Sequence, residues 1–146
     1  MDLQLQGKRA LVTGGSRGIG KAIALALARE GVDVALLARG QEALASTAAE
    51  LSAATGRRVL GLRASTTDAA QVQAAVASAV QQLGGPIDIL VNAAAEPAGF
   101  AAPPTLRQIE AGYFQAEMDT KVMGYLRCAQ AAAASCDPGG CGCRPR

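Results

Sequence analysis

The sequence predicts an α/β domain in which helices cover both faces of a doubly wound parallel sheet. Four short apolar runs alternate with segments in which apolar residues recur at helical spacing, as in repeated strand–helix units. The runs are continuously apolar, which is typical of parallel strands buried on both faces. A glycine-rich turn joins the first run to the first helical segment, and such turns bind ligands in folds of this class.

The predicted elements follow one another in strand–helix order. Strands are predicted at residues 8–13, 33–37, 58–62 and 87–92, and helices at residues 17–30, 41–55 and 68–83. Gly31 and Gly56 stand where a glycine ends a helix, and Asp68 stands where an aspartate begins one. Right-handed crossovers between parallel strands then predict the strand order 3-2-1-4.

Helical spacing also predicts which residues face the core. In the first helix these are Ile23, Ala26 and Leu27. In the third helix they are Val72, Ala75, Val76, Ala79 and Val80. After a loop at residues 93–104, Thr105 is expected to cap a short helix through Glu110, and a longer helix is expected from Glu117 to Ala134.

Composition excludes several classes of function. The net charge is +2 with acidic and basic residues interspersed, so neither nucleic acid nor an anionic membrane surface is an expected partner. There is no charged leader and no apolar run long enough to span a bilayer, so a cytoplasmic location is expected. The chain has no histidine, and its 4 cysteines lack a usual zinc spacing, so no metal site is predicted.

The turn after the first strand has the construction of a phosphate site. The N–H groups at a helix start lack partners within the helix, and the helix dipole favours an anion there. Gly14 allows a tight turn, Gly18 lets backbone approach a pyrophosphate, and Gly20 lets the helix pack closely. The residues predicted to bind phosphate are Gly14, Ser16, Arg17, Gly18, Ile19 and Gly20.

The second strand ends in a way that favours NADP(H) over NAD(H). An NAD site places a carboxylate there to bind the ribose 2′-hydroxyl, whereas this chain has Ala38 and then Arg39. A guanidinium at this position suits a 2′-phosphate, and Arg17 could add a second positive charge. The alternative is that both arginines are solvated surface charges.

A nucleoside-triphosphatase site is a second interpretation of the same turn. Gly15 to Gly20 followed by Lys21 gives G-x-x-x-x-G-K, the start of a P-loop. The next residue is Ala22, which lacks the hydroxyl that binds Mg²⁺ in P-loops. The sequence therefore disfavours this interpretation.

Several motifs together resemble the short-chain dehydrogenase/reductase family. The chain has T-G-x-x-x-G-x-G at Thr13 to Gly20 and a strand end similar to D-x-L-V-N-N-A-G at Asp88 to Ala95. Gly124 matches the glycine of the family's N-x-x-G. Asp68 matches part of the family's D-V-T-D, and the likeness covers residues 5 to about 134. The resemblance implies a Rossmann-like, three-layer α/β/α fold, here incomplete.

The resemblance also implies roles for residues after the third and fourth strands. Ser65 replaces an aspartate that contacts the adenine in the family, and a serine can still accept a hydrogen bond. Asn92 is expected to brace the fourth strand against its neighbours. Ala93 and Ala94 follow it and are expected to line the cofactor site.

The family's catalytic set is incomplete in this chain. The resemblance implies hydride transfer between a nicotinamide and a small carbonyl or alcohol substrate, with proton transfer by the tyrosine of Y-x-x-x-K. Here Tyr113 and Tyr125 are followed four residues later by Glu117 and Ala129, so the motif is absent. Lys121 occupies the position of the family's asparagine and is either a variant of its water relay or a surface lysine. The chain alone is therefore expected to be inactive.

Residues 135–146 differ in composition from the rest. They are rich in Gly, Cys, Pro and Arg without apolar periodicity, so we predict a disordered segment, either a natural tail or an out-of-frame product of a truncated gene. Residues 1–134 then form the NADP(H)-binding domain. Alternatives for the whole chain are a non-catalytic nucleotide-binding module or a non-functional fragment. The resemblance implies that the helix at 117–134 could mediate homo-oligomer contacts.

Overall fold

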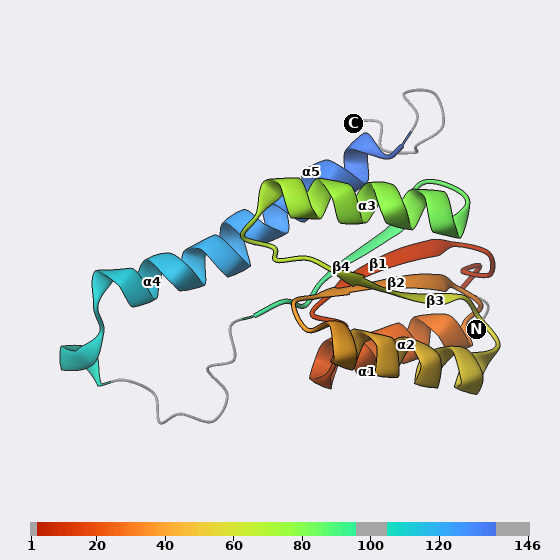
Figure 1. Cartoon of the computed structure of the whole chain (residues 1–146), viewed down its shortest axis with the longest axis horizontal. Helices are drawn as coiled ribbons and strands as arrows, with labels where there is room; N and C mark the ends of the chain where they lie inside the picture. The colour runs from red at the N-terminus through yellow and green to blue at the C-terminus, as the bar shows by residue number, and fades with distance from the viewer. Residues whose placement is uncertain (1–2, 96–104, 137–146) are drawn as a thin grey trace.

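The computed structural model of the chain describes residues 3–95 and 105–136. Its sheet has four parallel strands in the order β3-β2-β1-β4, which confirms the predicted order (Figure 1). The strands are β1 Arg9–Thr13, β2 Asp33–Ala38, β3 Val59–Arg63 and β4 Ile89–Asn92. The predicted doubly wound α/β class is therefore correct.

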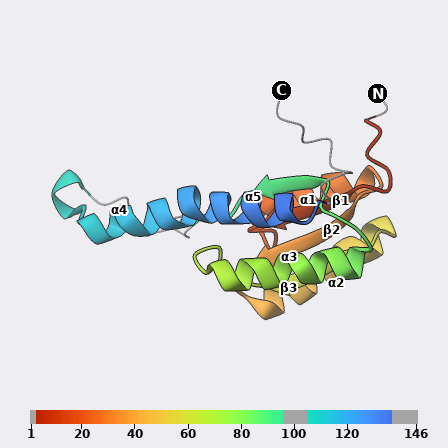
Figure 2. The ribbon, with the colours of Figure 1, turned by 90° about the horizontal axis from the view of Figure 1, so that it is seen from above.

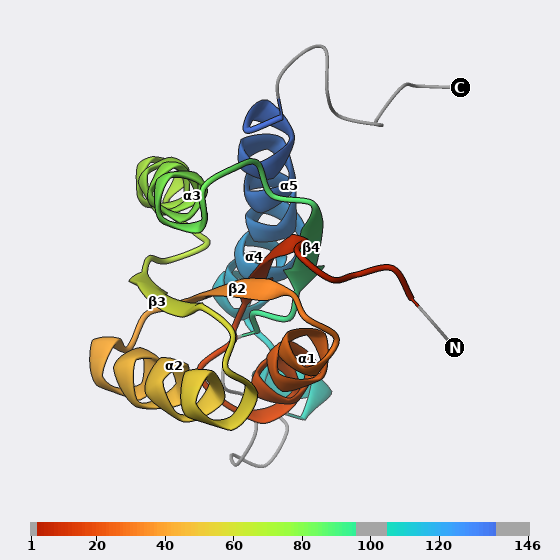
Figure 3. The ribbon, with the colours of Figure 1, turned by 90° about the vertical axis from the view of Figure 1, so that its right-hand side faces the viewer.

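Helices cover both faces of the sheet. The described helices are α1 Gly18–Arg29, α2 Gln41–Thr55, α3 Ala69–Leu83, η1 Leu106–Gln108, α4 Ala111–Met118, η2 Asp119–Met123 and α5 Gly124–Ala134. Figure 3 shows α1 and α2 on one side of the strands and α3 and α5 on the other. Two buried apolar clusters fill the spaces between these layers, and both include residues of the central strands β1 and β2.

Strand β4 is an edge of the sheet within the described residues. It pairs with β1 alone, and all four of its residues are only half-buried. This matches a four-stranded, incomplete sheet. An apolar edge strand of this kind is a template for pairing with further chain.

The buried face of α1 differs from the prediction. The residues that face the sheet are Gly20, Ala24 and Ala28, whereas Ala26 is exposed and Ile23 and Leu27 are only half-buried. The reason is that Gly20 packs against the backbone of the glycine turn, which aims the stripe of small residues inward. Helix α3 buries the predicted face, with Val80 half-buried and Leu83 added.

Residues 111–134 form one long helical rod. The predicted short helix is a single 3-10 turn, η1, that follows Thr105, whose N–H donates to Gln108 Oε1 at 2.9 Å. The predicted longer helix begins at Ala111, six residues before Glu117, and contains a π-helical segment, η2, between α4 and α5. Figure 2 shows α4 and α5 as successive parts of this rod. Beyond Ala95 the predicted loop at 93–104 lies outside the described residues.

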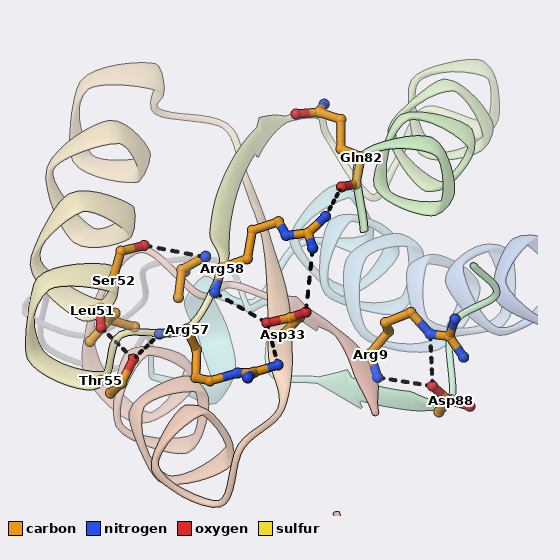
Figure 4. A network of polar contacts seen from close by, with 10 residues as sticks. Arg9, Asp33, Leu51, Ser52, Thr55, Arg57, Arg58, Gln82 and Asp88 are labelled. Carbon is orange, nitrogen blue, oxygen red and sulfur yellow. Dashed lines mark hydrogen bonds and ion pairs between the residues drawn. The ribbon is translucent and has the colours of Figure 1, made fainter. Parts of the chain in front are cut away.

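Ion pairs tie together the amino ends of the strands. Asp33, the first residue of β2, accepts from Arg57 Nη2 at 2.8 Å and from the Arg58 N–H at 3.1 Å (Figure 4). Asp88, just before β4, accepts from both the N–H and Nε of Arg9. Burial raises the pKa of Asp88, but the hydrogen bonds from Arg9 outweigh it and lower the pKa below its usual value. These contacts fix the strand register at the amino ends of the strands, which lie opposite the glycine turn.

The end of α5 is held against the sheet. Ser135, the first residue of the segment predicted to be disordered, is the C-cap of α5, and its hydroxyl accepts from the Ile87 N–H at 3.2 Å. Residues 137–146 lie outside the described part of the chain. Within the described residues, no helix is long and apolar enough to cross a bilayer, and no cluster of three or more His, Cys, Asp or Glu side chains could hold a metal ion.

Candidate cofactor cleft

A cleft of about 840 Å³ opens at the carboxyl edge of the sheet. Its walls come from the turn after β1, the end of β2, the loop after β3, the residues after β4 and one residue of η2. Of the residues predicted to bind cofactor, those that line it are Gly14, Ser16, Arg17, Gly18, Ile19, Gly20, Arg39, Ser65, Ala93 and Ala94. Asn92 and Lys121 are not among the lining residues.

Three glycines of the turn are required by its geometry. Gly14 and Gly18 have φ values of +66° and +57°, which residues with side chains rarely adopt. A Cβ on Gly14 would lie 2.7 Å from the carbonyl oxygen of Ala93, and a Cβ on Gly20 would collide with the carbonyl oxygen of Gly14. Open space lies where Gly18 would carry a Cβ, so a ligand can approach the backbone there.

Two neighbouring elements hold the turn in place. The Gly14 N–H donates to the Leu37 carbonyl of β2 at 2.8 Å. The buried hydroxyl of Thr47, on α2, donates to the Ser16 carbonyl at 2.9 Å. Sequence reasoning missed Thr47. A polar residue within the apolar stripe of a predicted helix, here between Leu44 and Leu51, is the signal that could have revealed it.

Thr13 joins the end of β4 to the turn. Its hydroxyl has no solvent exposure; it accepts from the Ala93 and Ala94 N–H groups, both at 3.1 Å, and donates to the Val91 carbonyl at 3.4 Å. The Oδ1 of Asn92 is buried without a hydrogen-bond partner among the described residues, and the bracing role of Asn92 stays a prediction. Thr13 fixes the cleft wall formed by Ala93 and Ala94.

The far end of the cleft lies at the β2 and β3 ends. Arg39 follows β2 and is exposed, and the loop from Ser65 to Thr67 follows β3 beside it. Ser65 Oγ lies 2.8 Å from Thr67 Oγ1, and the Ser65 N–H donates to the Gln71 side chain at 3.0 Å. Asp68 caps α3 as predicted, by accepting from the Gln71 N–H.

Two lysines named in the sequence analysis do not line the cleft. Lys21 pairs with Glu50 of α2 at 2.6 Å and does not line the cleft, which removes the phosphate-binding lysine of the P-loop interpretation. Lys121 has a side chain 51% exposed and pairs with Glu117 at 2.6 Å, and this hydrogen bond raises the pKa of Lys121. Its neighbour Thr120 is buried and lines the cleft.

Comparisons with known proteins agree with this architecture. The 3-oxoacyl-[acyl-carrier-protein] reductase of Staphylococcus aureus is 37% identical over 125 residues, covering 86% of this chain and 49% of the relative. L-Sorbose reductase from Gluconobacter frateurii, solved with NADPH and L-sorbose, superposes with a TM-score of 0.82 and 34% identity over 92% of this chain and 49% of that one. Carveol dehydrogenase from Mycobacterium avium, solved with NAD, gives 0.77 and 28% over 89% of this chain and 50% of that one.

The family assignment follows from a match along most of the chain. The chain spans about half the length of each of these three proteins. The sequence pattern of the family described as short chain dehydrogenase matches residues 8–142, which extends past the predicted limit at about residue 134. The chain therefore belongs to the short-chain dehydrogenase/reductase family.

Proposed function

We propose that this chain is the NADP(H)-binding half of a short-chain dehydrogenase/reductase that acts on a small carbonyl or alcohol substrate. The observation that carries the proposal is the convergence in one cleft of the glycine turn and Arg39, which come from the ends of adjacent strands. When bound, the nicotinamide accepts or donates a hydride. The chain's own residues hold the cofactor and orient it.

Each part of the cleft suits one part of the dinucleotide. The N–H groups at the start of α1, exposed beside Gly18, suit the pyrophosphate. Arg39 suits the 2′-phosphate, and Ser65 lies beside it on the adenosine side. Ala93 and Ala94 then border the nicotinamide side. Because the relatives include one solved with NADPH and one with NAD, the preference for NADP(H) rests on Arg39.

The wild-type chain is expected to bind NADPH without turning over. NADPH at about 100 times its Kd should stabilise the fold by about 2.7 kcal/mol, visible as a rise in Tm. Carbonyl reduction should be undetectable because no Y-x-x-x-K occurs in the 146 residues. No rise in Tm at millimolar NADPH would support the non-functional fragment instead, and NADPH-dependent reduction by the pure chain would refute the expected inactivity.

Replacing Arg39 tests the cofactor preference. Arg39→Leu should weaken NADPH binding by about 10- to 100-fold, since it removes charge-assisted hydrogen bonds to the 2′-phosphate. NADH binding, measured by the same calorimetric titration, should be unchanged. Arg29→Leu, on the last turn of α1 and outside the cleft, is the matched control. Equal losses of affinity for NADPH and NADH would show that Arg39 does not bind the 2′-phosphate.

We also propose that the rod from α4 to α5 contacts a second copy of the chain. Its exposed apolar side chains recur at helical spacing, at Met118, Val122 and Leu126, and Met123 lies beside them. Sedimentation velocity over a dilution series distinguishes a dimer from a monomer.

A further inference from the structure

Two segments far apart in the sequence meet in one wall of the cleft. Thr66, in the loop after β3, and Thr120, in the π-helical segment η2, are 6% and 5% exposed, and both line the cleft. Gly124, one turn after Thr120, packs on Thr66, since a Cβ on Gly124 would lie 3.0 Å from Thr66 Cβ and Oγ1.

Arg127 connects these two segments from α5. Its Nη1 lies 2.8 Å from Asp119 Oδ1 and donates to the main-chain carbonyls of Asp119 at 3.4 Å and Thr66 at 3.3 Å. The Arg127 side chain is 23% exposed, so these contacts are only partly screened by water. One guanidinium therefore binds the first residue of η2 and the loop after β3 together.

The Asp119 carbonyl is the acceptor that defines the π turn. The Gly124 N–H donates to it across five residues, which is the π-helical pattern. Arg127 supplies a second donor to the same oxygen and also pairs with the side chain of that residue. Because π turns are rarer than α turns, a segment of this kind needs support from outside the helix backbone.

We propose that Arg127 is a positioning residue that keeps η2 in its π-helical form and so holds Thr120 in the cleft wall. An α-helical turn has one residue fewer than a π turn, so relaxation to α would rotate the rod N-terminal to η2 by about 100° relative to α5. That rotation would carry Thr120 out of the wall and change the surface that a ligand meets. The effect on cofactor binding rests on the proposed function, whereas the effect on η2 does not.

Amide hydrogen exchange of the full chain measures the helix directly. In Arg127→Met the Gly124 N–H should exchange at least about tenfold faster, because η2 then moves between π and α forms and this N–H is transiently without an acceptor, while the amides of α3 and the last turns of α5 keep wild-type rates. Arg127→Lys retains the positive charge, but its shorter side chain does not place the ammonium where Nη1 meets both carbonyls, so its Gly124 rate should lie between the two. Arg107→Met, an exposed arginine on η1, is the control and should match wild type.

Titration with NADPH measures the consequence for the cleft. Arg127→Met should bind NADPH about tenfold more weakly, Arg127→Lys less so, and Arg107→Met like wild type. Wild-type exchange at Gly124 in Arg127→Met would overturn the proposal, as would an equal increase across α5, which indicates general destabilisation. Faster exchange at Gly124 with unchanged NADPH affinity would overturn the link to the cleft. Failure of the wild-type chain to bind NADPH would refute the proposed function, and the exchange rates would still decide the role of Arg127.

Discussion

Gly20→Ala is expected to lower the free energy of unfolding by about 3 kcal/mol and to abolish the Tm increase with NADPH. The added Cβ would collide with the Gly14 carbonyl oxygen, which belongs to backbone and cannot rotate aside as a side chain can. Helix α1 must then move away from the turn, and its first N–H groups no longer point into the cleft. Urea denaturation with and without NADPH measures both effects.

Gly112→Ala is the matched control for this substitution. Gly112 lies inside α4, and apart from its chain neighbours and the backbone of its own helix no atom lies within 4 Å of where its Cβ would be. Alanine there should stabilise the helix by up to about 1 kcal/mol and leave NADPH binding unchanged. If Gly20→Ala unfolds at the same urea concentration as Gly112→Ala and still binds NADPH, the close contact between α1 and the turn is not required.

Thr13→Val is expected to lower the free energy of unfolding by about 2 kcal/mol. It should also weaken NADPH binding, and the fraction of NADPH affinity lost should exceed the fraction of unfolding free energy lost. Valine fills the same space but removes the acceptor for the Ala93 and Ala94 N–H groups. These groups are half-buried, so water can replace only part of the lost bonding. The cleft wall after β4 should then loosen.

Thr13→Ser provides the comparison, because it keeps the hydroxyl and removes only a methyl group. It should retain NADPH affinity close to wild type while losing about 1 kcal/mol of stability from the buried methyl. Denaturation and calorimetric titration of both variants separate the hydrogen bonds from packing. Equal NADPH affinity in the valine and serine variants would contradict the role of the hydroxyl.

Local signals were enough to predict the sheet and the glycine turn. Continuous apolar runs indicated parallel strands, and Gly56 and Asp68 marked helix ends at the residues observed. The buried face of α1 could not be read from its apolar residues, because tight packing of Gly20 on Gly14 turns a stripe of small residues inward. The pattern of hydrophobic residues in α1 does not indicate this steric constraint.

The cleft could be predicted from the sequence where backbone geometry forms it, but not where side-chain contacts form it. Gly14 and Arg39 follow directly from strand ends, so their place in the cleft was predictable. The π turn that brings Thr120 to the cleft depends on a tertiary contact from Arg127, which leaves no periodic signal in the sequence. Likewise, the hydrogen bond from the Ala93 amide to the Thr13 hydroxyl could not be predicted, because only the fold brings the two groups together.

The most direct test of the central claim is a crystal structure of this chain with NADPH. We predict that the pyrophosphate lies against the main-chain N–H groups from Gly18 to Gly20 and that the 2′-phosphate lies within hydrogen-bond distance of the Arg39 guanidinium. A cleft that stays empty at saturating NADPH, or a bound NADPH whose 2′-phosphate lies away from Arg39, would contradict the account.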